Sequence, residues 1–123
     1  ESTLSKVRGT FTHSAPEVFM GSDWTTASDI YSLGILMWEL AERCVQGHHQ
    51  SPYSDKPELK YDFQILLKTV AGLRPTISKS MPFPMVALIT RCWHELPRCR
   101  PSAIEVLGEL QQIQVLYEDQ QGW

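Results

Sequence analysis

Twelve residues near the middle of the chain constrain its fold more than any other segment. From Ile30 to Ala41, nine of the twelve residues are apolar. They cover every face of a helix instead of one stripe, and a helix that is apolar all round must be buried on all sides. We therefore expect a central helix from Ala27 to about Arg43, buried by a shell of other elements. A chain of 123 residues offers little material for such a shell.

The rest of the chain predicts further helices and no sheet. Helices are expected at about 15–20, 61–72, 85–94 and 102–117. Pro16 favours the first turn of the first of these helices, and Gly21 ends it. The last helix begins with a capping box, because Glu105 follows Ser102 by three residues. Three polar residues are candidate N-caps of the central helix: Ser22, Asp23 and Thr25. The expected fold class is mainly α.

Charge and hydropathy argue against two classes of partner. The formal net charge is −3, and the basic residues are scattered apart from Arg91, Arg98 and Arg100. A nucleic-acid-binding domain normally carries a basic stripe, so we expect no nucleic-acid partner. The longest apolar run, around 35–38, is far shorter than the roughly 20 residues that span a bilayer, so we expect no membrane insertion of this segment. No signal peptide is visible, which favours a cytoplasmic protein.

The cysteines do not form a recognisable framework. The chain contains three of them: Cys44, Cys92 and Cys99. They are too few and too unevenly placed for a set of disulfides, so we expect buried free thiols. A zinc site would have to combine Cys92 and Cys99 with His94 and the His48-His49 pair. No CxxC or HxxxH spacing supports it, and we expect no bound metal.

Three segments together resemble the last third of a protein kinase domain. They are "GTFTHSAPE" at 9–17, "SDIYSLGILMWEL" at 28–40 and "RCWHELPRCRPSAIEVLGEL" at 91–110. Their order and spacing resemble the end of the family's activation segment, its central buried helix and its closing helices. Cys92-Trp93, Pro97 and Arg100-Pro101 resemble the tyrosine-kinase and tyrosine-kinase-like branch, and "SPYSDKPE" and "GLRPTI" fit the same branch.

The resemblance covers about residues 1–112 and implies the helical C-terminal subdomain of a protein-kinase-like fold. We expect a partial kinase domain over 1–116, from the activation segment onward, and a frayed tail over 117–123. The chain opens at Glu1, inside what resembles the activation segment, so we expect a fragment of a larger domain. The N-terminal remainder of that domain would then be its first partner.

Two carboxylates have alternative interpretations. Glu17 begins a short helix, where a carboxylate suits the helix dipole. The resemblance implies instead an ion pair between Glu17 and Arg100 that ties the activation segment to the base of the lobe. Asp29 would cap the central helix, or, by resemblance, accept hydrogen bonds from a catalytic loop that lies upstream of this chain. Leu36 and Leu40 would support the packing beneath the ATP site.

The resemblance also implies a substrate-binding loop. In serine/threonine kinases the hydroxyl at the position of Thr10 supports the catalytic loop, bridging its aspartate and a lysine, whereas tyrosine kinases usually have a proline in this region. Gly9-Thr10 therefore favours Ser/Thr substrates. The implied substrate-binding residues are Gly9, Thr10, Phe11, Thr12, His13 and Glu39. Glu39 would meet a basic substrate residue or satisfy only a local hydrogen bond. His13 and Ser14 depart from the usual aromatic and Met or Leu residues, which favours weak activity.

Three hydroxyl side chains lie where activation-loop phosphorylation often occurs: Ser2, Thr3 and Ser5. A phosphate there would order the loop by pairing with an arginine. The alternative is a solvated Ser/Thr-rich loop.

The groups that perform phosphoryl transfer are missing from the sequence. The reaction needs a glycine-rich loop, a lysine, magnesium ligands and an aspartate base. The patterns GxGxxG, VAIK, HRD and DFG do not occur in these residues, so we predict no catalytic residue in this chain. The resemblance implies a parent kinase that uses ATP and Mg²⁺ to phosphorylate Ser/Thr of protein substrates. A pseudokinase and an all-α protein-interaction module are the alternatives.

Overall fold

The computed structural model describes residues 11–121, and its secondary structure is helical. Its elements are α1 (Pro16–Phe19), α2 (Thr26–Gln46), α3 (Asp62–Val70), α4 (Phe83–Cys92), the 3-10 helix η2 (Pro97–Cys99) and α5 (Ala103–Gln121). The described residues contain no β-strand, so the prediction of a mainly α fold is confirmed. Five residues singled out above lie outside the described range: Ser2, Thr3, Ser5, Gly9 and Thr10.

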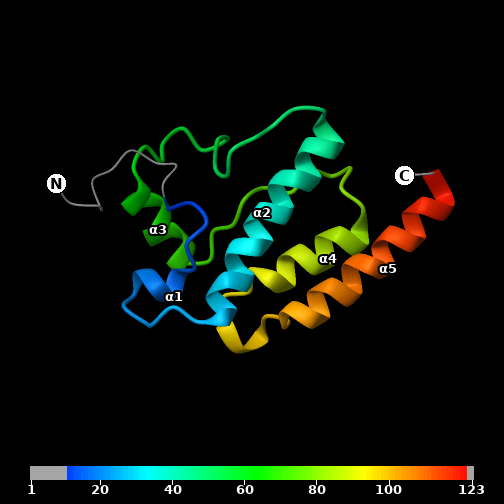
Figure 1. The fold of residues 1–123 in the computed structure, drawn as a ribbon. Coiled ribbons are helices and arrows are strands. Elements are labelled where there is room, and N and C mark those ends of the chain that lie inside the picture. The colour runs from blue at the N-terminus through cyan, green and yellow to red at the C-terminus, as the bar shows by residue number, and fades with distance from the viewer. Residues whose placement is uncertain (1–10, 122–123) are drawn as a thin grey trace.

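The long helix α2 runs through the middle of the molecule, with α1 and α3 on one side and α4 and α5 on the other (Figure 1). It begins at a capping box in which the Thr25 hydroxyl accepts from Ser28 N at 3.3 Å and the Ser28 hydroxyl accepts from Thr25 N at 3.1 Å. It ends at Gly47, whose φ of 83° is the left-handed conformation that glycine adopts most readily. The central helix is as predicted, except that it continues to Gln46 instead of about Arg43.

The main core lies between α2 and α4. Six hydrophobic residues on these two helices are at most 2% exposed: Tyr31, Ile35, Trp38, Leu88, Ile89 and Cys92. The two helices approach most closely at Gly34, where an added Cβ would lie 2.8 Å from the Cβ of Cys92. Because carbon atoms do not pack that closely, the helix pair requires a residue without a side chain at this position.

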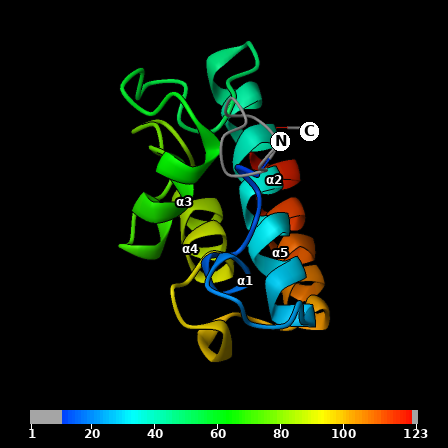
Figure 2. The ribbon, with the colours of Figure 1, turned by 90° about the vertical axis from the view of Figure 1, so that its left-hand side faces the viewer.

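The short helix α3 lies beside α1 on the other side of the molecule (Figure 2). A second, smaller cluster of buried side chains supports it: Tyr53, Leu59 and Ile65. Tyr53 and Leu59 come from the long loop between α2 and α3, so this loop is packed under the helix that it leads to. The arrangement places the start of α3 next to the segment that precedes α1.

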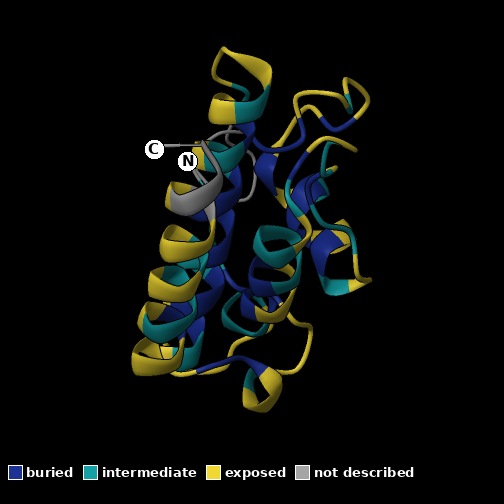
Figure 3. Cartoon of the chain, turned by 90° about the vertical axis from the view of Figure 1, so that its right-hand side faces the viewer, coloured by how far each residue is buried: buried dark blue, intermediate teal, exposed yellow. Residues whose placement is uncertain are grey.

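One side of the central helix is not covered by the described residues. Leu36 is 47% exposed and Leu40 is 56% exposed, although both belong to the apolar stretch of α2. On α5, Ile104 and Leu107 are 82% and 55% exposed, and the outer face of this helix is largely exposed (Figure 3). The expectation that α2 is buried on all sides is therefore wrong within residues 11–121, because the other helices surround only part of it.

Two smaller predictions also need correction. The helix α5 continues to Gln121 instead of ending near Tyr117, and no Gly or Pro interrupts it there. Of the three thiols expected to be buried, only that of Cys92 is; Cys44 and Cys99 are exposed. Cys44 lies on the last turns of α2, where its neighbours Glu42 and Val45 face the interior and it does not, and Cys99 lies on η2, which has no buried residue.

Within residues 11–121, no helix is both long and apolar enough to cross a bilayer. In the same part of the chain, no three His, Cys, Asp or Glu side chains are grouped so that they could hold a metal ion.

Candidate substrate-docking site

The segment 11–15 leads into α1 and is held by the start of α3. Phe11 N donates a hydrogen bond to Asp62 Oδ2 at 3.1 Å. Asp62 is the first residue of α3 and is only 1% exposed. A buried carboxylate needs hydrogen-bond donors, and this backbone N–H is one of them. The sequence analysis missed Asp62, because a carboxylate in the first turn of a helix is ordinary and its partner lies 51 positions away.

The same segment is also attached to α2. Ser14 N donates to Phe11 O at 3.1 Å and closes a turn. The Ser32 hydroxyl donates to His13 O at 2.7 Å, and Ser32 belongs to α2. Ala15, the last residue of the segment, is fully buried. Segment 11–15 is therefore fixed by hydrogen bonds to two helices and by burial at its end.

Three ionisable side chains contact one another at this segment, and one of them, His13, belongs to it. His13 Nε2 lies 2.5 Å from Glu39 Oε1, and His49 Nε2 lies 3.1 Å from Glu39 Oε2. The Thr12 hydroxyl and His13 Nδ1 are 3.0 Å apart. The Glu39 side chain is 15% exposed, whereas those of His13 and His49 are 39% and 54% exposed. We call Glu39, His13 and His49 the Glu39 cluster; it joins segment 11–15, α2 and the loop after α2.

The Glu39 cluster brings together three of the residues proposed from the sequence for substrate binding: Thr12, His13 and Glu39. The sequence analysis weighed His49 only as a zinc ligand and did not connect it with Glu39. The two residues are ten positions apart, and the turn that brings His49 back onto α2 follows Gly47. A glycine at the end of a helix is visible in a sequence, but the direction of the chain after it is not.

Glu17 and Arg100, the proposed ion pair, lie in contact. Arg100 Nη1 donates to Glu17 Oε2 at 2.8 Å, and Nη2 donates to Oε1 at 2.9 Å. The Ser28 hydroxyl donates to Glu17 Oε2 at 3.0 Å. Burial by itself would raise the pKa of Glu17, but the hydrogen bonds and the charge of Arg100 hold this pKa below its usual value. Glu17 is therefore kept in its charged form.

Arg100 also ties together segments that are distant in the sequence. Its side chain is fully buried, and it donates further to Ala27 O and to His94 O, each at 2.9 Å. Its guanidinium lies 5.1 Å from the ring centre of Tyr31, and the guanidinium of Arg74 lies at the same distance from that ring. The ring of Tyr31 is thus in cation–π contact with two arginines. The sequence did not indicate these contacts of Tyr31 and Arg74.

Asp29 lies at the surface in the first turn of α2. Its Oδ1 accepts a hydrogen bond from Trp24 Nε1 at 2.5 Å. The N-cap of α2 is Thr25, so capping, one of the two interpretations of Asp29, is performed by another residue. Trp24 is 53% exposed and was not singled out from the sequence.

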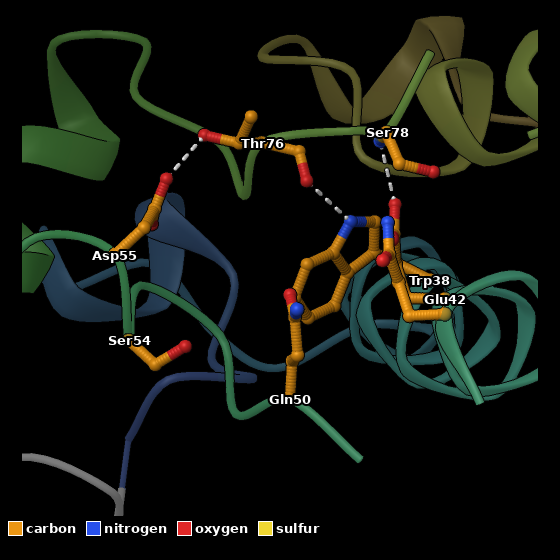
Figure 4. Close-up of a pocket in the computed structure, with 8 residues that line it drawn as sticks. Trp38, Glu42, Gln50, Ser54, Asp55, Thr76 and Ser78 are labelled. Atoms are coloured by element: carbon orange, nitrogen blue, oxygen red, sulfur yellow. Dashed lines mark hydrogen bonds between the residues drawn. The ribbon is translucent and has the colours of Figure 1, made fainter. Parts of the chain in front are cut away.

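A cavity of about 240 Å³ lies beside the C-terminal half of α2, away from segment 11–15. Three hydrogen bonds cross its wall: Trp38 Nε1 to Thr76 O, the Thr76 hydroxyl to Asp55, and Ser78 N to Glu42 (Figure 4). These bonds connect segment 76–78 with α2 and with the loop that follows α2. None of the site residues proposed from the sequence lines this cavity.

Comparison with known proteins identifies the family. Residues 2–110 match the family model for protein tyrosine and serine/threonine kinase. In Dictyostelium discoideum, stress-activated protein kinase alpha is 40% identical over 94% of this chain and 18% of its own length. A probable serine/threonine-protein kinase is 43% identical over 94% of this chain and 14% of its own. A probable tyrosine-protein kinase is 41% identical over 80% of this chain and 28% of its own.

The chain therefore spans less than a third of the length of each of these curated relatives. The family match, in contrast, extends over most of the chain and includes all the helices described above up to the middle of α5. This chain belongs to the family of protein tyrosine and serine/threonine kinases, and its helices are those of the C-terminal lobe of the kinase domain.

Proposed function

We propose that this chain forms the substrate-docking and scaffold part of a kinase domain whose parent protein transfers the ATP γ-phosphate to Ser/Thr of protein substrates. The observation that carries the proposal is the attachment of segment 11–15. Asp62 holds its start, Ser32 holds its middle, and the Glu17–Arg100 pair holds the helix that follows. Phosphoryl transfer depends on positioning of the acceptor hydroxyl, and a firmly held loop is suited to that task.

Within this proposal, the peptide substrate contacts the loop that precedes α1, which includes residues 9–13, and Glu39 at its base. A carboxylate that is 15% exposed on the floor of such a surface is suited to a basic substrate side chain. Thr10 and Asp29 support the catalytic loop of the parent. The exposed carboxylate of Asp29 is accessible to backbone N–H donors from that loop.

The preference for serine and threonine rests on Gly9-Thr10 and on the resemblance to the tyrosine-kinase-like branch. Four of the Dictyostelium relatives are probable serine/threonine-protein kinases, which favours the same specificity. One relative is a probable tyrosine-protein kinase, so the acceptor residue is a point for direct measurement.

The residues of this chain do not fit ATP or Mg²⁺. The sequence has none of the four patterns that hold the nucleotide and the metal ions, and residues 11–121 contain no group of metal ligands. We assign these functions to the N-terminal remainder of the kinase domain. When bound there, Mg²⁺ and ATP supply the phosphoryl group and neutralise its charge. The same remainder covers Leu36 and Leu40, the exposed apolar pair on α2.

Ser2, Thr3 and Ser5 are proposed phosphorylation sites of the parent. Their phosphates would lie within ten residues of the segment that Asp62 and Ser32 hold. A charge-assisted bond between a phosphate and an arginine would hold this part of the activation segment in place.

The test is a radiolabelled ATP assay on the purified parent protein, with peptides that carry Ser, Thr or Tyr as the single acceptor. We expect transfer to Ser and Thr peptides by the parent and no transfer by the 123-residue chain alone. Transfer to Tyr peptides alone would contradict the proposed specificity, and transfer by the isolated chain would contradict the absence of catalytic groups. A parent that binds the peptides without transfer would be a pseudokinase. An isolated chain that is monodisperse and melts cooperatively would instead support an independent all-α module.

A further inference from the structure

The carboxylate of Glu39 is already occupied on both sides. Its Oε1 contacts His13 and its Oε2 contacts His49, at 2.5 and 3.1 Å. A basic substrate side chain that approaches Glu39 must therefore displace one imidazole or share an oxygen with it. The two imidazoles differ in how firmly they are held.

His13 is the more firmly held of the two. It is a member of segment 11–15, its carbonyl accepts from Ser32, and its Nδ1 has the Thr12 hydroxyl as a second partner at 3.0 Å. His49 has the longer contact with Glu39 and a side chain that is 54% exposed. Among the contacts of the described residues, its ring has no second partner. His49 is therefore the imidazole that an incoming group displaces at lower cost.

We propose that His49 is a specificity-determining residue: it competes with the basic side chain of a substrate for Glu39. The inference rests on the proposed function, because it assumes that peptides bind beside segment 11–15. Glu39 then binds the lysine or arginine of a substrate only after His49 has left its carboxylate, so the His49 contact sets the affinity for a basic side chain. The competing group belongs to the loop between α2 and α3, which the family resemblance did not connect with substrate selection.

The contacts of the two rings give the competition a recognisable signature. Removal of the His49 ring frees Glu39 Oε2, while Oε1 stays paired with His13. A basic substrate side chain then reaches a carboxylate oxygen without displacing an imidazole. Its affinity for Glu39 should therefore rise when the His49 ring is removed and be lost when the carboxylate is removed.

Two further basic side chains lie near the Glu39 cluster among residues 11–121. His48 is adjacent to His49 in the loop after α2; it is exposed, and its Nδ1 lies 3.4 Å from His49 O. On α2, Arg43 follows Glu39 by one turn and is exposed. Both are unchanged when the His49 ring is removed, so a comparison of the two proteins isolates the contribution of that ring.

The test measures peptide binding to the full parent protein by fluorescence anisotropy at one fixed pH. The peptides form pairs that differ only in arginine or its neutral analogue citrulline at each position near the acceptor. We expect one position at which the unmodified protein prefers arginine, and at that position His49→Ala should raise the preference about two- to fivefold, the range of a partly exposed ion pair. Glu39→Gln should abolish the preference.

His48→Ala is the matched control, since it removes a neighbouring exposed imidazole that does not contact Glu39. We expect it to leave the arginine preference unchanged. An arginine preference that is the same with and without the His49 ring would overturn the proposal. Because the readout is binding, it remains valid if the parent transfers no phosphate, so failure of the proposed function and failure of this inference are distinguishable. A KM ratio for the same peptide pairs provides the second measurement in an active parent.

Discussion

Arg100 joins three segments of the chain that are distant from it in the sequence or belong to other elements. Its guanidinium pairs with Glu17, bonds two carbonyl oxygens and lies over Tyr31, with no exposure of the side chain. The planar fork of arginine matches both oxygens of a carboxylate, whereas lysine offers only a point charge. A buried pair of this kind contributes little net stability compared with apolar residues, but the loss of one partner leaves the other charge buried and alone.

We therefore predict that Arg100→Met destabilises the kinase domain of the parent by about 3–5 kcal/mol in urea unfolding. The free energy of unfolding of Arg100→Lys should lie between those of Arg100→Met and the unmodified protein, because lysine keeps the charge and loses the two-point contact. Arg98→Met is the matched control: Arg98 is exposed on η2, two residues away, and its loss should change the free energy of unfolding by less than about 0.5 kcal/mol. Equal effects at the two positions would show that the pair does not carry this stability.

Asp62 is the second residue with a specific expected effect. It is 1% exposed and accepts the backbone N–H of Phe11, so it fixes the start of segment 11–15 on α3. We expect Asp62→Ala to raise KM for protein substrate in the parent by about tenfold and to lower kcat less, because the loop that we propose as the peptide-binding loop loses one of its two attachments. Faster hydrogen exchange at the Phe11 amide provides a readout independent of activity.

Asp23→Ala serves as the control for Asp62→Ala. Asp23 is an exposed carboxylate on the loop before α2, and we expect it to alter neither KM nor the exchange rate at Phe11. A KM that is unchanged by Asp62→Ala, together with unchanged exchange, would mean that segment 11–15 is held without this carboxylate.

At the scale of the elements, the contact of α2 with α4 depends on a missing side chain. Gly34→Ala would place a Cβ 2.8 Å from the Cβ of Cys92, and both atoms belong to the rigid part of their residues. The two helices must move apart, and overpacking of this kind costs about 1–3 kcal/mol, more than the gain in helix propensity. We expect a lower urea midpoint for the parent domain.

Gly108→Ala on α5 tests the same substitution without the clash, because nothing lies within 4 Å of the added Cβ. Here the gain in helix propensity, about 0.5–1 kcal/mol, should dominate and raise stability. Opposite signs at the two glycines would support the close approach of α2 and α4. Stabilisation at both positions would contradict it.

The sequence predicts features that depend on neighbouring residues, and it does not predict contacts that only the fold brings about. The helices followed from apolar spacing, and the start of α5 at Ser102 followed from a capping box, since both are local properties of the chain. Capping rules offered three candidates for the start of α2, of which Thr25 is the N-cap. The end of α5 was missed because the apolar spacing stops before the polar residues that precede Gly122. At the site, Asp62 and His49 were missed because their partners, Phe11 and Glu39, come close only through the fold. Local sequence carries no signal for such a contact.

At the scale of the whole molecule, the exposed side of α2 is the feature that distinguishes a free-standing domain from part of a larger one. Leu36 and Leu40 lie one turn apart on the helix that holds the core, and about half of each side chain is exposed. Isolated exposed leucines are common on protein surfaces. An exposed pair on the central helix of a domain is unusual, because that helix is the one that the other elements surround.

We predict that Leu40→Ala has effects of different size in the chain alone and in the parent kinase domain. In the 123-residue chain the side chain is 56% exposed, so its truncation should cost less than about 1 kcal/mol and should reduce self-association measured by sedimentation. In the parent, where we propose that the remainder of the domain covers this side, the same change should cost about 2–5 kcal/mol in urea unfolding, as for a buried leucine.

Phe83→Ala is the reference substitution for this comparison. Phe83 begins α4 and is 78% exposed, and it lies on a different helix from the leucine pair. Its truncation should have an equally small effect in both proteins. If Leu40→Ala also had the same small effect in both, the rest of the parent would leave this side of α2 uncovered, and Leu36 and Leu40 would need a partner outside the kinase domain. A large effect of Leu40→Ala in the parent alone would show that another part of the kinase domain covers this side of α2.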